Sequence, residues 1–248
     1  MTEPEQRDNL YAHQMDWVEN FTFDESVASV FQDMIVRSVP GYRTTLAMIG
    51  VIASRFVTPG SRVYDLGCSL GAGTIIAANA SPVADYEVIG VDTSQPMLQH
   101  CRGMIDQQPP RAKVQLVCED IRNTAITDAS VVLLNFTLQF IPVEDRLAMI
   151  RKIYEGLNPG GVMVLSEKIH FESPEKEELL YQLHHDFKRC NGYSDLEISQ
   201  KRNALENILV TETLQTHRKR VLDAGFASAN LWFQCFNFAS LVAVKKSD

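Results

Sequence analysis

Between residues 62 and 168, short apolar runs alternate with helix-length stretches, and this alternation constrains the fold more than any other feature. The runs are rich in Val, Ile and Leu and lie at 62–66, 87–92, 113–118, 130–136 and 161–168. Strands that are apolar almost throughout are buried on both faces. Their alternation with helices therefore predicts an α/β fold, a mostly parallel sheet with helices on both faces.

Two further strand-like runs, 229–238 and 240–246, close the chain and are separated by one residue. So short a connection can only join antiparallel neighbours, so we expect a C-terminal hairpin. Together with the five earlier runs, it completes a seven-stranded sheet.

Two segments interrupt this alternation and read as helices. Residues 10–58 have a helical pattern broken at "SVPGY" (38–42), and residues 169–218 fall between the fifth strand and the hairpin. We expect one domain over 1–248, in which 10–58 form a helical lid and 169–218 a helical insertion that contacts substrate. The first eight residues are polar and are expected to be mobile.

Composition restricts the classes of partner. No run of about 18 apolar residues is present and no signal peptide is visible, so the sequence predicts neither a membrane span nor export. The five cysteines are scattered without a C-x-x-C pair, which indicates reduced thiols in a cytoplasmic protein and no metal site. A net charge of −8 disfavours direct nucleic-acid binding, so a small molecule is the better candidate substrate.

The loop after the first strand reads "VYDLGCSLGAGT" (63–74) and matches D-x-G-x-G-x-G as Asp65, Gly67, Ser69 and Gly71. Ligands of such folds bind at the carboxyl ends of the strands, where this loop lies. A carboxylate at Asp65 would repel a pyrophosphate, whereas S-adenosylmethionine has no phosphate and carries an amino group and a sulfonium. The pattern therefore favours S-adenosylmethionine, although the glycines could also serve only a tight strand–helix turn.

Polar residues at the ends of three later strands support this interpretation. Asp92 could accept both ribose hydroxyls of an adenosine, and it also opens a good helix-capping sequence. Asp120 is placed to accept a hydrogen bond from the adenine amino group, with Ile121 covering the ring, although a loop aspartate is often a turn former. Asn135 ends the fourth strand, beside the first.

The pattern resembles the class I S-adenosylmethionine-dependent methyltransferase superfamily over 60–168 and 220–246, which implies a Rossmann-like sheet. More narrowly, the "SVPGY", "NFTLQF" and "HHDFKRCNGYSDLEISQKR" segments resemble the carboxy-S-adenosylmethionine synthases from about residue 23 to 246. That resemblance implies conversion of S-adenosylmethionine and prephenate to carboxy-S-adenosylmethionine and phenylpyruvate, a carboxymethyl donor for the modification of wobble uridine in tRNA. It also implies a homodimer.

The family's ligand residues carry over to ten positions. They are Tyr42, Gly67, Cys68, Ser69, Asp92, Thr93, Asp120, Ile121, Asn135 and Arg202. As the resemblance implies, the methyl group of the sulfonium loses a proton, to the departing hydroxide or to a nearby base, and captures the CO₂ that prephenate releases. This chemistry requires a closed, dry pocket.

Arg202 is the expected partner of the carboxylate gained in the reaction, because a guanidinium binds a carboxylate through two parallel hydrogen bonds. The alternative is an exposed Arg202 paired with Glu206, four residues on. Prephenate carries two carboxylates and needs further cations, for which the candidates are Lys188, Arg189, Lys201 and Arg37. His184 and His185 are possible acid–base groups.

Two other functions stay open. One is a conventional methyltransferase acting on a small molecule or tRNA, and the other is an S-adenosylmethionine-binding protein without catalysis. The strand-four end lacks the "[DN]-P-P-[YFW]" element of many nitrogen methyltransferases, which disfavours that subtype. Fold alone does not decide among these functions.

Overall fold

The seven strands form one sheet in the order β3-β2-β1-β4-β5-β7-β6. The computed structural model describes residues 7–206 and 208–247, and its strands are β1 Ser61–Leu66, β2 Tyr86–Asp92, β3 Lys113–Cys118, β4 Ala129–Asn135, β5 Leu157–Lys168, β6 Asn230–Cys235 and β7 Phe238–Val244. Strands β1 to β5 run parallel to one another, while β7 runs antiparallel between β5 and β6. The predicted sheet with its antiparallel C-terminal hairpin is therefore confirmed.

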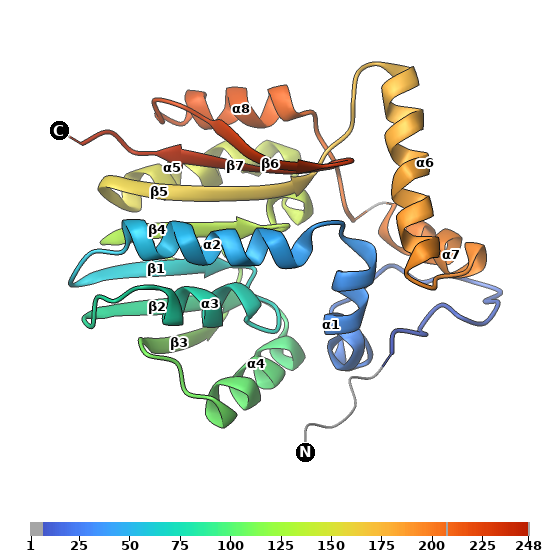
Figure 1. Ribbon diagram of the computed structural model, residues 1–248, viewed down its shortest axis with the longest axis horizontal. Helices are drawn as coiled ribbons and strands as arrows, with labels where there is room; N and C mark the ends of the chain where they lie inside the picture. The colour runs from blue at the N-terminus through green and yellow to red at the C-terminus, as the bar shows by residue number, and fades with distance from the viewer. Residues whose placement is uncertain (1–6, 207, 248) are drawn as a thin grey trace.

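Helices cover both faces of this sheet (Figure 1). They are α1 Glu25–Ser38, α2 Tyr42–Phe56, α3 Ala72–Ala80, α4 Gln95–Gln107, α5 Arg146–Gly156, α6 Pro174–Cys190, α7 Asp195–Leu205 and α8 Leu214–Asp223, with 3₁₀ turns η1 Leu138–Phe140 and η2 Val143–Asp145. Helices α2 and α3 pack on one face around Ile49, Val63 and Val131. Helices α5 and α8 pack on the other around Ile150 and Val221. Each of the described helices is too short or too polar to cross a membrane.

Helices α1, α6 and α7 do not cover the sheet but stand beyond the carboxyl ends of its parallel strands, at the right of Figure 1. We call these three helices the cap. The segment 10–58 contributes α1 to the cap but places α2 on the sheet, and the segment 169–218 contributes α6 and α7. Because the carboxyl ends are where parallel sheets bind ligands, the cap lies over the expected site.

The prediction of helix over 10–58 is wrong for residues 10–24, which form turns and extended chain. This segment crosses α7 instead. The Gln200 side chain donates to the carbonyls of Tyr11 and His13, at 2.9 Å each, and the backbone N–H of Phe21 donates to the Ala204 carbonyl. Bonds to α7 thus take the place of bonds within a helix, and α1 begins only at its N-cap, Asp24.

The predicted mobility of the first eight residues is wrong at its end. Residues 1–6 lie outside the described residues, but Asp8 is 2% exposed and accepts a hydrogen bond from the Tyr193 hydroxyl. Three boundaries also shift. The hairpin turns at Phe236 and Asn237 rather than at residue 239, β5 starts at Leu157 rather than at 161, and the last helix, α8, runs to Asp223.

Candidate functional site

The glycine loop between β1 and α3 has the backbone that its sequence predicts. Gly67 and Gly71 both have φ of +81°, a left-handed conformation that residues with a side chain rarely adopt. Ser69 has φ of +52°. A Cβ added at Gly67 would collide with the Thr137 side chain. The backbone N–H groups of Gly67 and Cys68 both donate to the Val91 carbonyl, at 2.8 and 3.0 Å, which fixes the loop against β2.

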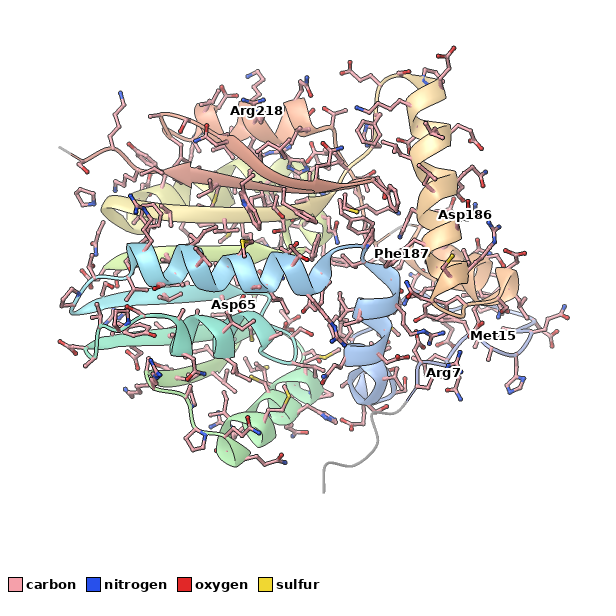
Figure 2. All side chains as sticks on the ribbon, in the orientation of Figure 1. Arg7, Met15, Asp65, Asp186, Phe187 and Arg218 are labelled. Atoms are coloured by element: carbon pink, nitrogen blue, oxygen red, sulfur yellow. The ribbon has the colours of Figure 1, made fainter. Side chains whose placement is uncertain are left out.

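Asp65 lies below this loop rather than on its surface. It is 2% exposed and accepts a 2.7 Å hydrogen bond from the Thr74 hydroxyl of α3 (Figure 2 shows it in the interior, between the ribbons of α2 and α3). Burial raises the pKa of this carboxyl to about 6, despite the bonds from Thr74 that lower it. This carboxyl group therefore lies beneath the loop and not on its surface.

Asp92 at the end of β2 anchors the loop through its side chain. Its Oδ2 accepts from the backbone N–H of Ser69 at 2.8 Å, and its Oδ1 accepts from that of Ser94 at 2.9 Å. Ser94 in turn caps α4, so the helix-cap interpretation of the "DTSQP" segment is confirmed. Each carboxylate oxygen keeps a second lone pair, which suits it to accept a ribose hydroxyl. Thr93, next to it, is exposed.

Asn135 at the end of β4 has a buried Oδ1 with no hydrogen-bond partner among the described residues. A buried polar atom without a partner is costly, and at a ligand-binding edge it indicates an atom reserved for a ligand. Asn135 pairs in register with Ser166 of β5. Its own strand, β4, lies next to β1, the strand that leads into the glycine loop. Of the observations at this edge of the sheet, the unpartnered oxygen of Asn135 best supports the binding of S-adenosylmethionine there.

Asp120 and Ile121 follow β3. Ile121 is 5% exposed and lies in the core cluster. Asp120 faces Arg122, whose Nε donates to both carboxylate oxygens at 3.1 and 3.0 Å, and this partner holds the pKa of Asp120 below its usual range. A ligand amino group would therefore share Asp120 with Arg122. Cys68 is buried, which raises the pKa of its thiol.

An aromatic wall extends from the loop toward the cap, consisting of Tyr42, Phe136, Phe238 and His184. Ring centroids are 6.5 Å apart for Tyr42 and Phe136, 5.9 Å for Phe136 and Phe238, and 4.9 Å for Phe238 and His184. Phe136 has φ of +63°, an unfavourable backbone for a bulky residue. Burial, and then the charge of Asp65, raise the pKa of the Tyr42 hydroxyl.

Arg202 of α7 is exposed and donates a 2.8 Å hydrogen bond to the Tyr181 hydroxyl of α6. Among the described residues it forms no ion pair, so the expected alternative pairing with Glu206 is absent. Its charge acts on two lysines of neighbouring elements, Lys168 at the end of β5 and Lys188 of α6, and lowers the pKa of each. We call Lys168, Lys188 and Arg202 the open cation cluster.

The other candidate cations have protein partners. Lys201 lies 3.6 Å from a carboxylate oxygen of buried Asp8, and Arg37 donates to Asp33 at 2.9 Å and to the Asp8 carbonyl at 3.2 Å. We call Asp8, Arg37, Lys201 and Tyr193 the closed cluster. Arg189 pairs with Asp186 and Asp195 on the surface. Of the four candidates, Lys188 alone has no ion-pair partner among the described residues. Lys168 was not among the candidates predicted from the sequence.

The two histidines differ in environment. His184 is 2% exposed and shares a 2.9 Å hydrogen bond with the Ser38 carbonyl, so its ring serves to pack the cap. His185 stacks on Tyr181, with ring centroids 4.1 Å apart. Burial and the adjacent Lys188 lower the pKa of both, that of His185 to about 4, so both rings are neutral near pH 7.

The fold and site define the class of protein. The family model of the methyltransferase domain matches residues 63–161, which cover β1 through the start of β5. An O-methyltransferase family protein from Burkholderia thailandensis has a TM-score of 0.64 at 15% identity over 98% of this chain and 64% of its own. Magnesium protoporphyrin IX methyltransferase from Synechocystis, with bound SAM, has a TM-score of 0.57 at 18% identity, covering 88% and 84%. These likenesses establish the methyltransferase fold.

Curated relatives identify a narrower family. The chain is 53% identical to the carboxy-S-adenosyl-L-methionine synthase of Haemophilus ducreyi, over 97% of this chain and 99% of that protein. It is 55% identical to the synthase of the same name from Trichlorobacter lovleyi, over 96% and 98%. The chain therefore belongs to the carboxy-S-adenosyl-L-methionine synthase family.

Proposed function

We propose that this chain converts S-adenosylmethionine and prephenate to carboxy-S-adenosylmethionine and phenylpyruvate. The observation that carries the proposal is the open cation cluster beside a site built for a sulfonium ligand. Cations near a positively charged sulfonium repel it, so their purpose is to bind anionic groups. They suit an enzyme whose second substrate and whose product both carry carboxylates.

The ligand residues proposed for S-adenosylmethionine follow the strand ends. Gly67, Cys68 and Ser69 would give it a close backbone approach, and Asp92 with Thr93 would hold the ribose. Asp120 and Ile121 would contact the adenine, while the free Oδ1 of Asn135 supports a contact to the bound molecule. Tyr42 would cover the ligand from the start of α2, and Asp65 would favour its positive charge from beneath the loop.

Arg202 is proposed to bind the carboxylate that the reaction adds. Its guanidinium is exposed and uncompensated by a protein carboxylate among the described residues, so it is free to make a bidentate pair. S-adenosylmethionine supplies the methyl carbon that becomes the carboxymethyl group. The cap and the aromatic wall would exclude water, because CO₂ has to be retained until it is captured.

The wider role is also a proposal. Carboxy-S-adenosylmethionine would leave this cytoplasmic enzyme as the carboxymethyl donor for wobble uridine in tRNA. The net charge of −8 supports a separate enzyme for the tRNA step, because an acidic protein is expected to bind the phosphates of tRNA weakly. The functional unit would be a homodimer.

The test is an assay of purified protein with S-adenosylmethionine, with and without prephenate, followed by mass spectrometry. The proposal predicts carboxy-S-adenosylmethionine and phenylpyruvate in equal amounts, and only when prephenate is present. Formation of S-adenosylhomocysteine with a methylated acceptor, independent of prephenate, would refute it and support a conventional methyltransferase. Binding without turnover would support the non-catalytic reading.

A further inference from the structure

The open cation cluster brings together positive side chains from three separate elements. Lys168 ends β5, Lys188 lies in the last turn of α6, and Arg202 lies in the last turn of α7. Burial lowers the pKa of both lysines, and neighbouring cations lower each further: Arg202 acts on Lys168, and Lys168, Lys201 and Arg202 act on Lys188. The geometry agrees: Phe238, the register partner of Lys168, has its ring centroid 4.9 Å from that of His184, which lies one helical turn before Lys188 in α6.

Neither lysine of this cluster is neutralised by the protein. Within 7–206 and 208–247, neither ammonium nitrogen has a hydrogen bond, and none of the ion pairs includes them. The charge of Glu177 acts on Lys168, but one oxygen of that carboxylate accepts from the backbone N–H of Phe171, at 2.8 Å. Like charges that are partly buried without a counter-ion lower stability, and such arrangements are typical of ligand sites.

Lys168 also adjoins the aromatic wall. It pairs in register with Phe238 of β7, and paired residues of neighbouring strands point to the same face of a sheet. Phe238 contacts Phe136 edge-on, and Phe136 reaches Tyr42 near the glycine loop. A ligand in contact with Lys168 would thus have unsaturated rings beside it, on the side that leads to the proposed S-adenosylmethionine site.

We propose that Lys168 and Lys188 form a second carboxylate-binding subsite, distinct from Arg202, which holds the carboxylate that prephenate keeps in phenylpyruvate. The ring of the substrate would lie against Phe136 and Phe238. Arg202 is then left for the carboxylate that is transferred. This inference rests on the proposed function, and it names the groups that orient the second substrate.

The experiment uses the full chain with Lys168→Gln, Lys188→Gln, Lys188→Arg and a control, Lys176→Gln. Lys176 is an exposed residue of α6, and it lies over the Phe171 ring on the surface. The measurements are the KM for prephenate, the inhibition constant of phenylpyruvate, and the Kd of S-adenosylmethionine. Each Gln variant should raise the first two by about 10- to 100-fold, the loss expected for one charge-assisted hydrogen bond, and should change the Kd by less than about twofold.

Lys188→Arg keeps the charge and should recover most of the affinity for phenylpyruvate, whereas Lys176→Gln should behave as the wild type. The ligand-free Gln variants should melt no lower than the wild type, because they remove repulsion rather than a contact. Wild-type values of KM and inhibition constant in both Gln variants would overturn the subsite. A lower melting temperature for ligand-free Lys188→Gln would do the same, since it would make the lysine a structural group.

Failure of the subsite and failure of the proposed function remain distinguishable. If the wild type forms carboxy-S-adenosylmethionine from prephenate and the Gln variants match it, the reaction stands and the subsite is wrong. If the wild type forms none, the proposed function is wrong. In that case, the wild type would be titrated directly with phenylpyruvate by calorimetry. Absence of binding would show that the subsite is wrong as well.

Discussion

Two cationic clusters in and beside the cap differ in their pairing. The closed cluster includes a buried acid, Asp8, whereas the cations of the open cluster form no ion pair among the described residues. Lys201 and Arg202 are neighbours in α7, yet Lys201 is 9% exposed beside Asp8, whereas Arg202 is exposed and has only the Tyr181 hydroxyl. The closed cluster joins the N-terminal segment to α1 and α7 through Asp8, Arg37 and Tyr193. In the open cluster, Arg202 joins α7 to α6 through the Tyr181 hydroxyl, and neither lysine has a hydrogen bond among the described residues.

This difference separates structural charges from charges that await a ligand. A buried carboxylate that accepts from a tyrosine and lies beside a lysine contributes to the fold, and its removal leaves uncompensated cations. A group of cations without an ion-pair partner lowers the stability of the free protein, and under the proposal it gains its counter-ion when substrate binds. The predictions below test this division, in order of decreasing effect.

Arg202→Ala should weaken binding of carboxy-S-adenosylmethionine by about 100-fold or more, since a bidentate charge pair is lost, while the affinity for S-adenosylmethionine stays within about threefold. Calorimetry with both ligands measures the split. Arg189→Ala, which removes an exposed arginine of α6 paired with Asp186 and Asp195, is the control. Equal losses for the two ligands would contradict the role assigned to Arg202.

Asp8→Asn should act on stability and not on substrate. It leaves Lys201 buried without a counter-ion, so the free energy of unfolding should fall by about 3 kcal/mol or more. Chemical denaturation measures this, with Asp16→Asn, an exposed acid of the same segment, as the control. An unchanged stability, or a KM for prephenate that rises as much as in Lys188→Gln, would erase the distinction between the clusters.

Asp92→Ala should weaken S-adenosylmethionine and carboxy-S-adenosylmethionine alike, by about 10- to 100-fold, because it removes a carboxylate that also anchors the loop at Ser69. Titrations with the two ligands give the ratio of the losses. A loss confined to the carboxylated ligand would place Asp92 with Arg202 and against the ribose role.

The stability of the ligand-free protein should depend on pH through Lys188, whose pKa is lowered to about 7 by burial and by Lys168, Lys201 and Arg202. Below about pH 7 both states hold this proton, and the cost of the buried charge is full. Between about pH 7 and 10 the unfolded chain keeps a proton that the folded chain has lost, so stability rises with pH, by at most about 1.4 kcal/mol per pH unit for one proton.

Denaturant unfolding at several pH values measures this slope in the wild type and in Lys188→Gln. The difference between the two proteins isolates Lys188 from other titrating groups. The variant should lack the part of the slope between pH 7 and 10. Superimposable slopes would show that Lys188 does not carry a depressed pKa in the folded state.

The sheet and the glycine loop could be predicted because their signals are local. Apolar runs of strand length fix β1 to β5, and Gly67 and Gly71 adopt the positive φ that glycine tolerates. Asn135 and Asp92 could be placed because the carboxyl ends of parallel strands meet at one edge. Their roles as ligand residues remain predictions.

The sequence named Arg202 and Lys188 of the open cluster, but Lys168 and the grouping of the three could not be predicted, because they depend on contacts between distant segments. Lys168 ends a buried strand and could equally have been solvated, and the residues around it in the sequence do not indicate the cap beside it. The fate of Lys201 was hidden for the same reason, since its partner Asp8 lies 193 residues earlier in a stretch that composition marks as a tail. Only the tertiary structure shows that, of two adjacent residues of α7, Lys201 is paired with an acid and Arg202 is not.

The most direct test of the account follows the carbon that the reaction transfers. Prephenate labelled with ¹³C in its ring carboxylate would be incubated with the purified protein and S-adenosylmethionine, and the adenosyl product weighed. The proposed reaction yields carboxy-S-adenosylmethionine that carries the label, alongside unlabelled phenylpyruvate. An unlabelled carboxylated product, or S-adenosylhomocysteine in its place, would contradict the proposed reaction.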